Sequence, residues 1–173
     1  SSAASDVYKR QVQLLVYYGV NVTAVCATKS IELVKSLGAK KVIDFEKQDF
    51  TKDGQTYNYV FDTVGKSSFF KCMKLLKKGG IYISSYLGYM SQNLFLPLLT
   101  PLIRPLLNNR KSVFPVPVDI KGSLFLVKEL IQQGKFKAVI DRSFLLEQIV
   151  DAYNYVETGE KIGNVVINID SKS

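Results

Sequence analysis

The first half of the chain alternates short apolar runs with amphipathic segments. The runs that have the length of buried strands are Val22–Cys26, Lys41–Phe45, Tyr59–Val64 and Gly80–Ser85. The apolar residues that recur at helical spacing between them are Ile31, Val34 and Leu37, then Phe69, Phe70, Met73 and Leu76. Strands that alternate with helices in this way pair in parallel. The pattern therefore predicts an α/β fold with a doubly wound parallel sheet.

The second half is less regular. Asp119 is placed to cap a helix over Gly122–Gln133, a second helix is predicted over Glu147–Glu157, and Asn164–Ile169 reads as a last strand. The apolar segment Leu94–Leu107 contains three prolines and an arginine. It is shorter than the ~20 residues that a membrane-spanning helix needs. We therefore expect no transmembrane segment here, and interpret it as a lid or an interface.

A polar elbow, Ala27–Ser30, follows the strand Val22–Cys26. In open α/β sheets ligands bind at the carboxyl ends of the strands, and an acid at this point would accept a hydrogen bond from a ribose 2′-hydroxyl. The elbow offers Thr28 and Lys29 and no acid, which suits a 2′-phosphate. It predicts NADP(H) as the cofactor, with NAD(H) less favoured. The structural alternative is that Thr28 caps a helix and Lys29 is solvated.

Composition narrows the function further. The 173 residues carry a net charge of +8, no histidine and two cysteines. The lysines stand in scattered pairs without interleaved aromatic residues, so no nucleic-acid binding is expected, and a phosphorylated cofactor or simple solubility explains the charge. Without histidine the chain has neither His-based catalysis nor a His/Cys zinc site, and no metal is expected. Cys26 and Cys72 read as small buried apolar side chains.

Five motifs together resemble the nucleotide-binding half of a medium-chain dehydrogenase/reductase of the zinc-independent, quinone-oxidoreductase-like branch. They are VTAVCATKSIELVKSLGAKKVID, YVFDTVG, LKKGGIYISS, GKFKAVID and GEKIGNVVI, within residues 12–170. The resemblance implies a Rossmann-type domain over residues 12–140 and a segment, 141–173, that returns to pack on a preceding catalytic domain. It also implies an NADPH-dependent oxidoreductase that transfers hydride to a quinone, enone or related carbonyl without metal.

The chain departs from this family where the glycine-rich phosphate loop should lie. Residues 1–11, SSAASDVYKRQ, contain no glycine, and backbone amides approach a pyrophosphate closely only where side chains are absent. We interpret residues 1–11 as foreign or artefactual and the chain as a C-terminal fragment whose sheet lacks its first strand and glycine-rich loop. Such a chain should bind NADPH poorly and catalyse nothing. Ala27 and Phe45 also replace the Ser and Tyr that relatives often carry.

The resemblance implies further cofactor-binding residues beyond Thr28 and Lys29, at the ends of later strands and in the last loop. They are Thr63, Val64, Gly65, Ser84, Ser85, Phe114, Lys161 and Gly163. Each also has an ordinary structural explanation, such as a turn glycine, a polar strand end or core packing. Asp44, Asp141 and Glu147 lie at strand and helix ends, where capping and solvation are usual. No catalytic side chain is assigned, because in hydride transfer the cofactor carries the chemistry.

Another class of function also fits. The chain is then a non-catalytic nucleotide-binding module, or one that docks a partner or membrane through Leu94–Leu107. A methyltransferase is a more distant third candidate, because that class also requires a glycine-rich loop, and it requires an acid at the position of Lys29. For the oxidoreductase we expect a cytoplasmic protein, or one of an organelle matrix, whose full-length parent can form a homodimer.

Overall fold

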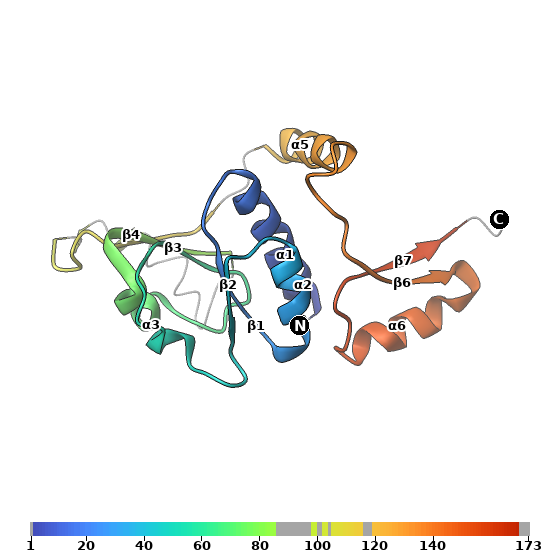
Figure 1. The fold of residues 1–173 in the computed structure, drawn as a ribbon, viewed down its shortest axis with the longest axis horizontal. Coiled ribbons are helices and arrows are strands. Elements are labelled where there is room, and N and C mark those ends of the chain that lie inside the picture. Colours follow the sequence, from blue (N-terminus) through green and yellow to red (C-terminus); the bar gives the residue numbers. More distant parts are fainter. Residues whose placement is uncertain (1, 86–97, 100–101, 104, 116–118, 170–173) are drawn as a thin grey trace. The chain divides into compact units, whose positions relative to one another are not determined.

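A computed structural model describes residues 2–85, 98–99, 102–103, 105–115 and 119–169 (Figure 1). The chain forms two compact units, which we describe separately. Unit 1 comprises Ser1–Glu46 with Asp119–Ser173, and unit 2 comprises Lys47–Val118. The division expected from the sequence, between residues 140 and 141, separates segments by function and stays a prediction.

Unit 1 begins with two helices and two paired strands. They are α1 (Ser2–Tyr17), β1 (Thr23–Cys26), α2 (Ile31–Ser36) and β2 (Lys41–Asp44). β1 pairs in parallel with β2, as predicted, and Cys26 is opposite Asp44. Val12, Val22, Ala24, Cys26, Val34 and Leu37 form a buried cluster between these elements. The apolar stripe predicted for α2 thus faces the core.

The helix α1 includes residues 2–11, for which the sequence pattern predicts neither a helix nor a strand. It begins at Ser2, although SSAASDVYKRQ has no apolar stripe that would indicate a helix. Farther along α1, the Gln13 side chain donates from Nε2 to the Lys137 carbonyl (3.1 Å) and accepts from the Lys137 amide at Oε1 (2.7 Å). Lys9 donates through Nζ to the Ile162 carbonyl. These long-range contacts hold α1 against the later part of unit 1.

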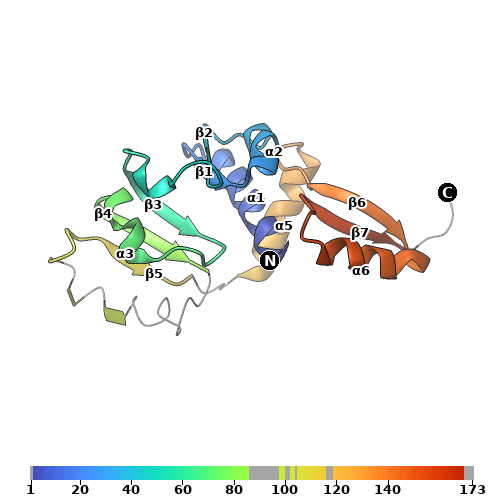
Figure 2. The same cartoon turned by 90° about the horizontal axis from the view of Figure 1, so that it is seen from below.

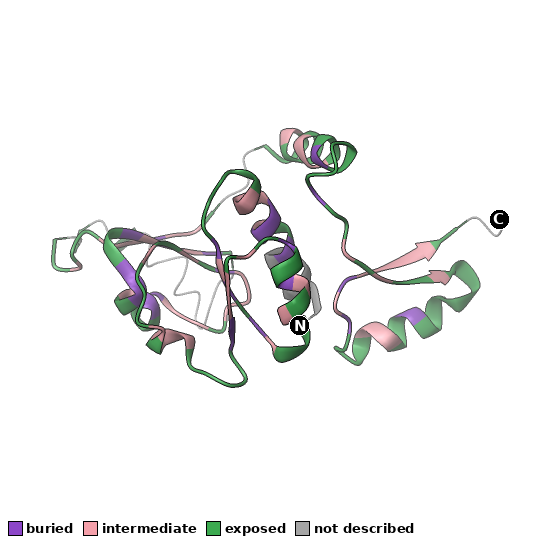
Figure 3. Cartoon of the chain, in the orientation of Figure 1, coloured by how far each residue is buried: buried purple, intermediate pink, exposed green. Residues whose placement is uncertain are grey.

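The rest of unit 1 contains α5 (Ile120–Gln132), β6 (Ile140–Leu145), α6 (Ile149–Glu157) and β7 (Asn164–Asn168). The Asp119 side chain caps α5, as predicted, by accepting from the Gly122 amide at 2.8 Å. β6 and β7 pair in parallel, and Figure 2 shows α6 lying along them. Most of α6 is exposed (Figure 3).

Unit 2 is built on a parallel sheet of β3 (Tyr57–Asp62), β4 (Leu76–Ser84) and β5 (Lys111–Val113), in that order. The helix predicted to run to Leu76 is shorter: α3 spans Phe69–Cys72, and a 3₁₀ turn spans Met73–Leu75. Leu76 already lies in β4, because it is fully buried against Phe69, Cys72 and Tyr82. Lys77, Lys78 and Gly79 belong to the same strand.

The described strands form separate sheets. Among the described residues β1 pairs only with β2, and β3 pairs only with β4. This agrees with the predicted lack of the first strand, which would be central in a single sheet. Each of these two strands keeps an unpaired edge, and large apolar side chains are exposed on them: Val25 (39%), Tyr59 (56%) and Phe61 (41%).

Much of the segment Leu94–Leu107 lies outside the described residues. Of its described part, Leu98, Leu99, Leu102 and Leu106 are exposed, and Leu107 packs against the core of unit 2. Its role as a lid or interface stays a prediction. In the part of the chain that the structure describes, we find no helix that is both long enough and apolar enough to cross a membrane.

The unpaired edge of β3 should promote aggregation, since exposed strand edges with apolar side chains template pairing with other chains. We expect Tyr59→Lys to raise the soluble, monodisperse fraction, because a charge on an edge strand opposes such pairing. Size-exclusion chromatography with light scattering measures this fraction. Phe70→Lys is the matched control, since Phe70 is equally exposed (55%) but lies on α3. Equal improvement in both variants would contradict an edge-specific effect.

Candidate functional site

The elbow after β1 carries the first two expected site residues. Residues Thr28–Ser30 form a 3₁₀ turn. The Thr28 hydroxyl donates to Asp44 Oδ2 (2.6 Å), and the Thr28 amide donates to Glu46 Oε2 (3.0 Å). The elbow residues themselves include no acid. The parallel pairing of β1 with β2 nevertheless brings two acids, Asp44 and Glu46, into contact with Thr28. Sequence reasoning missed both contacts because they join residues 16 and 18 positions apart.

These acids set the electrostatics of the elbow. The hydrogen bonds from the Thr28 amide and side chain, and the nearby Lys29 charge, lower the pKa of Glu46, which stays anionic at neutral pH. Burial, together with the charges of Asp44 and Glu46, raises the pKa of Cys26 to about 11. The Cys26 side chain is accordingly a protonated thiol of the core, in agreement with its apolar interpretation.

Lys29 ties the elbow to the loop between α6 and β7. Its Nζ donates to the carbonyl oxygens of Gly159 (3.1 Å) and Glu160 (3.2 Å). Thr28 does not cap a helix with its side chain. Ser30 occupies the N-cap position of α2, but its side chain makes no capping bond. Its backbone is helical (φ −102°, ψ −3°) where a capping residue is normally extended.

The last loop places Lys161 and Gly163 in a tight crossing of backbone. Lys161 is buried and donates from Nζ to the Gly163 carbonyl (3.3 Å). A Cβ on Gly163 would lie 2.8 Å from the Asp141 amide nitrogen and the Val139 carbonyl oxygen. Asp141 Oδ2 accepts from the Ile162 amide (2.6 Å) and from the Tyr155 hydroxyl (3.0 Å). Lys161 and Gly163 thus help to build the loop, and their role toward a cofactor stays a prediction.

In unit 2, Asp62 shapes the loop that contains Thr63, Val64 and Gly65. Its Oδ1 accepts from the amides of Val64 (3.2 Å) and Gly65 (2.8 Å), and its Oδ2 from the Ser67 amide (3.2 Å) and the Tyr82 hydroxyl (2.8 Å). Gly65 has φ +74°, which favours glycine. The predicted site residues omitted Asp62, although it ends an apolar strand beside a turn glycine.

The remaining predicted residues gather at the same edge of that sheet. Ser84 is buried and opposite Asp62 in the register, and the Ser85 amide donates to the Asp62 carbonyl (3.3 Å). Phe114 directly follows β5, whose Val113 is opposite Ile83, and is half-buried. The structure therefore brings the unit 2 candidates together, and separately joins Lys29, the neighbour of Thr28, to the last loop of unit 1.

The hydroxyl of Tyr82 should stabilise unit 2 through Asp62. Burial, and then the hydrogen bond to the carboxylate, raise the pKa of Tyr82. We expect Tyr82→Phe to lower the free energy of unfolding by about 1.5–3 kcal/mol, the usual range for a hydrogen bond to a charged group. Urea unfolding measures it. Tyr57→Phe, which removes a half-buried hydroxyl bound to Asp53 (2.6 Å), should cost less; the reverse order would contradict this role.

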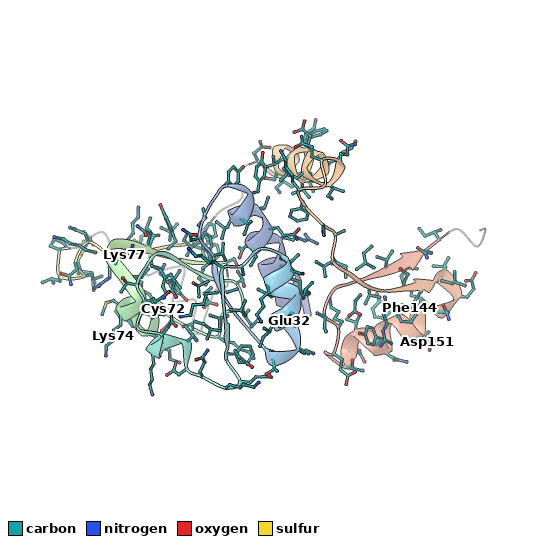
Figure 4. All side chains as sticks on the ribbon, viewed as in Figure 1. Glu32, Cys72, Lys74, Lys77, Phe144 and Asp151 are labelled. Atoms are coloured by element: carbon teal, nitrogen blue, oxygen red, sulfur yellow. The ribbon has the colours of Figure 1, made fainter. Side chains whose placement is uncertain are left out.

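Asp141 should make unit 1 sensitive to acid. Burial would raise the pKa of Asp141, but hydrogen bonds from Ile162, Tyr155 and Gly163 lower it overall from its ordinary value of 3.8. The ionised Asp141 therefore contributes its full stabilisation of the folded state above about pH 4. This contribution is lost as the pH falls through the lower pKa that Asp141 has in the folded state. Asp141→Asn should be less stable at pH 7 and lose less on acidification in urea titrations. The control is Asp151→Asn, at an exposed position on α6 (Figure 4). It should lose as much stability on acidification as the wild type.

The curated relatives of the chain are oxidoreductases. The 2-methylene-furan-3-one reductase of Solanum lycopersicum is 31% identical over 156 residues, which cover 88% of this chain and 34% of the relative. The chloroplastic NADPH-dependent alkenal/one oxidoreductase of Arabidopsis thaliana is 30% identical, with the same coverage of 88% and 34%. The chloroplastic quinone-oxidoreductase QR1 of Triphysaria versicolor is 29% identical, with 96% and 50%. The chain thus spans about a third to a half of their lengths.

The fold is shared with a solved quinone oxidoreductase of Coxiella burnetii, with a TM-score of 0.75 at 21% identity over 95% of this chain and 50% of that one. The sequence profile described as zinc-binding dehydrogenase matches residues 37–167. Both findings confirm the resemblance to medium-chain dehydrogenases/reductases and the Rossmann-type fold class. The chain belongs to the zinc-binding dehydrogenase family of NAD(P)-dependent oxidoreductases.

Proposed function

We propose that this chain supplies cofactor-binding machinery to an oxidoreductase that uses NADPH in preference to NADH and reduces a quinone, enone or related carbonyl. The observation that carries the proposal is the elbow, where the Thr28 amide already binds the Glu46 carboxylate and the charge of the adjacent Lys29 acts on that same carboxylate. The names of the relatives, an NADPH-dependent alkenal/one oxidoreductase and a quinone-oxidoreductase among them, support the substrate class.

The donors of the elbow fit a phosphate group. The Thr28 amide holds the Glu46 carboxylate at 3.0 Å, so it accommodates an anionic oxygen. Thr28 and Lys29 are both exposed, which leaves the Lys29 ammonium able to turn from the Gly159 carbonyl toward a bound ligand. A charge-assisted hydrogen bond from an ammonium to a phosphate is among the stronger contacts available at a surface.

In unit 2, we propose the residues at the edge of the sheet as cofactor contacts in their own right. The bound nicotinamide supplies the hydride. Gly65, without a side chain, would let the backbone of the Thr63–Gly65 loop approach the cofactor, and Ser84 and Ser85 would offer hydroxyls. Phe114 would exclude water from one face of the nicotinamide. In unit 1, Lys161 and Gly163 would close the last loop over the adenosine half, since Lys29 already holds that loop at Gly159.

The residues of this chain do not fit a zinc site, despite the family's name. The sequence has no histidine. Burial is the leading cause that raises the pKa values of both the Cys26 and the Cys72 thiols, whereas zinc binds thiolates. Across the described ranges, no group of three His, Cys, Asp or Glu side chains could hold a metal. We therefore propose a metal-free reaction.

We propose further that the groups contacting the substrate come mainly from a preceding catalytic domain, since this chain spans about a third to a half of its curated relatives. We also propose a homodimer of the whole protein, which stays an expectation from the family resemblance. The expected cytoplasmic or organelle-matrix location stays a prediction; two of the relatives named above, from Arabidopsis thaliana and Triphysaria versicolor, are chloroplastic.

Replacing Lys29 should change cofactor preference. In a chain whose glycine-rich loop has been restored, Lys29→Ala removes a charge-assisted contact worth about 1.5–3 kcal/mol, so NADPH affinity should fall roughly ten- to a hundredfold. NADH affinity should barely change, because a 2′-hydroxyl gains little from an ammonium. Calorimetric titration with both cofactors measures the two dissociation constants.

The matched control is Lys35→Ala, which removes an exposed ammonium from the same segment, where Lys35 pairs with Glu32 at 2.9 Å. It should leave both affinities as in the wild type. Equal weakening of NADPH and NADH by Lys29→Ala would mean that Lys29 only holds the last loop, and the phosphate assignment would be wrong.

A further inference from the structure

The Glu46 carboxylate occupies the anion-binding donor of the elbow. Its Oε2 accepts from the Thr28 amide at 3.0 Å. The position of Glu46 is fixed locally, because its own amide donates to Asp44 Oδ1 at 3.0 Å. Asp44 is buried and also accepts from the Thr28 hydroxyl. The turn after β2 thus presents the Glu46 side chain to the elbow.

A carboxylate and a phosphate compete for such a donor. A phosphate ester carries about −1.5 to −2 charges at neutral pH, so it is repelled by Glu46 as well as deprived of the Thr28 amide. A ribose 2′-hydroxyl carries no charge and can donate a hydrogen bond to the same carboxylate. Glu46 therefore disfavours the binding of NADPH, which carries the 2′-phosphate, and is compatible with the binding of NADH.

We propose that Glu46 is a specificity-determining residue of the elbow, an internal anion that a 2′-phosphate must displace. It weakens the preference for NADPH that Thr28 and Lys29 create, and so keeps NADH within reach. This inference rests on the proposed function of the elbow. Glu46 suits the role because its side chain is exposed and can swing into water by rotation about its own bonds. Asp44 does not suit it, because its carboxylate is buried among hydrogen bonds.

The test uses the 173-residue chain with two probes that differ in where the phosphate lies, adenosine 2′-monophosphate and adenosine 5′-monophosphate. Glu46→Gln removes the charge and keeps an acceptor for the Thr28 amide, whereas Glu46→Ala removes both. We expect calorimetry to show 2′-monophosphate affinity raised about five- to tenfold by Glu46→Gln, from the Coulomb repulsion between such charges near a surface. Glu46→Ala should raise it at least as much. Affinity for the 5′-monophosphate should stay within about twofold.

The matched control is Glu32→Gln, which removes the same charge from an exposed side chain on α2 (Figure 4). It should leave both affinities unchanged, which separates a local effect from the change in net charge. Equal gains in Glu32→Gln and Glu46→Gln would overturn the proposal. The proposal would also be overturned if both Glu46 variants bound adenosine 2′-monophosphate with the affinity of the wild type.

Lys29→Ala, titrated in parallel, separates this inference from the proposed function. If Lys29→Ala weakens the 2′-monophosphate and the Glu46 variants do not strengthen it, the elbow binds phosphate but Glu46 does not discriminate. If no variant changes its affinity, both proposals fall. The Thr28 amide resonance gives a second readout, because 2′-monophosphate should shift it at lower ligand concentration in Glu46→Ala than in the wild type. Identical titrations of that resonance would contradict displacement.

Discussion

The parallel pairing of β1 with β2 is the constraint on which the candidate site depends. The register sets Cys26 opposite Asp44, so the carboxyl ends of both strands meet at one edge. Asp44 then fixes the Thr28 hydroxyl, and the following turn delivers Glu46 to the Thr28 amide. A change of register by one residue would reverse the faces of these side chains and dismantle the elbow.

Lys29 extends this arrangement to the far end of the sequence. Its ammonium joins the Gly159 and Glu160 carbonyls, and Asp141 orders the same loop through the Ile162 amide. The loop is therefore held from two sides by charged groups that bind backbone. In unit 2, Asp62 acts in the same manner at the end of β3. In each case a carboxylate at a strand end organises the loop expected to meet the cofactor.

Local signals predicted most of the elements. Asp119 caps α5 as predicted, because a capping signal acts between residues a few positions apart. Prediction failed where tertiary packing decided the conformation. Leu76, whose spacing predicts a helical position, joins β4 because it is buried in the core of unit 2.

The sequence by itself determined the α/β alternation, the exclusion of histidine chemistry and the polar elbow with Thr28 and Lys29. It also indicated the interrupted sheet, since SSAASDVYKRQ offers no apolar run for a central strand. Only the tertiary structure decided that the elbow contains acids, because Asp44 and Glu46 reach Thr28 through strand pairing rather than through chain proximity. Charges far apart in sequence interact only once the fold has brought their strand ends to the same edge.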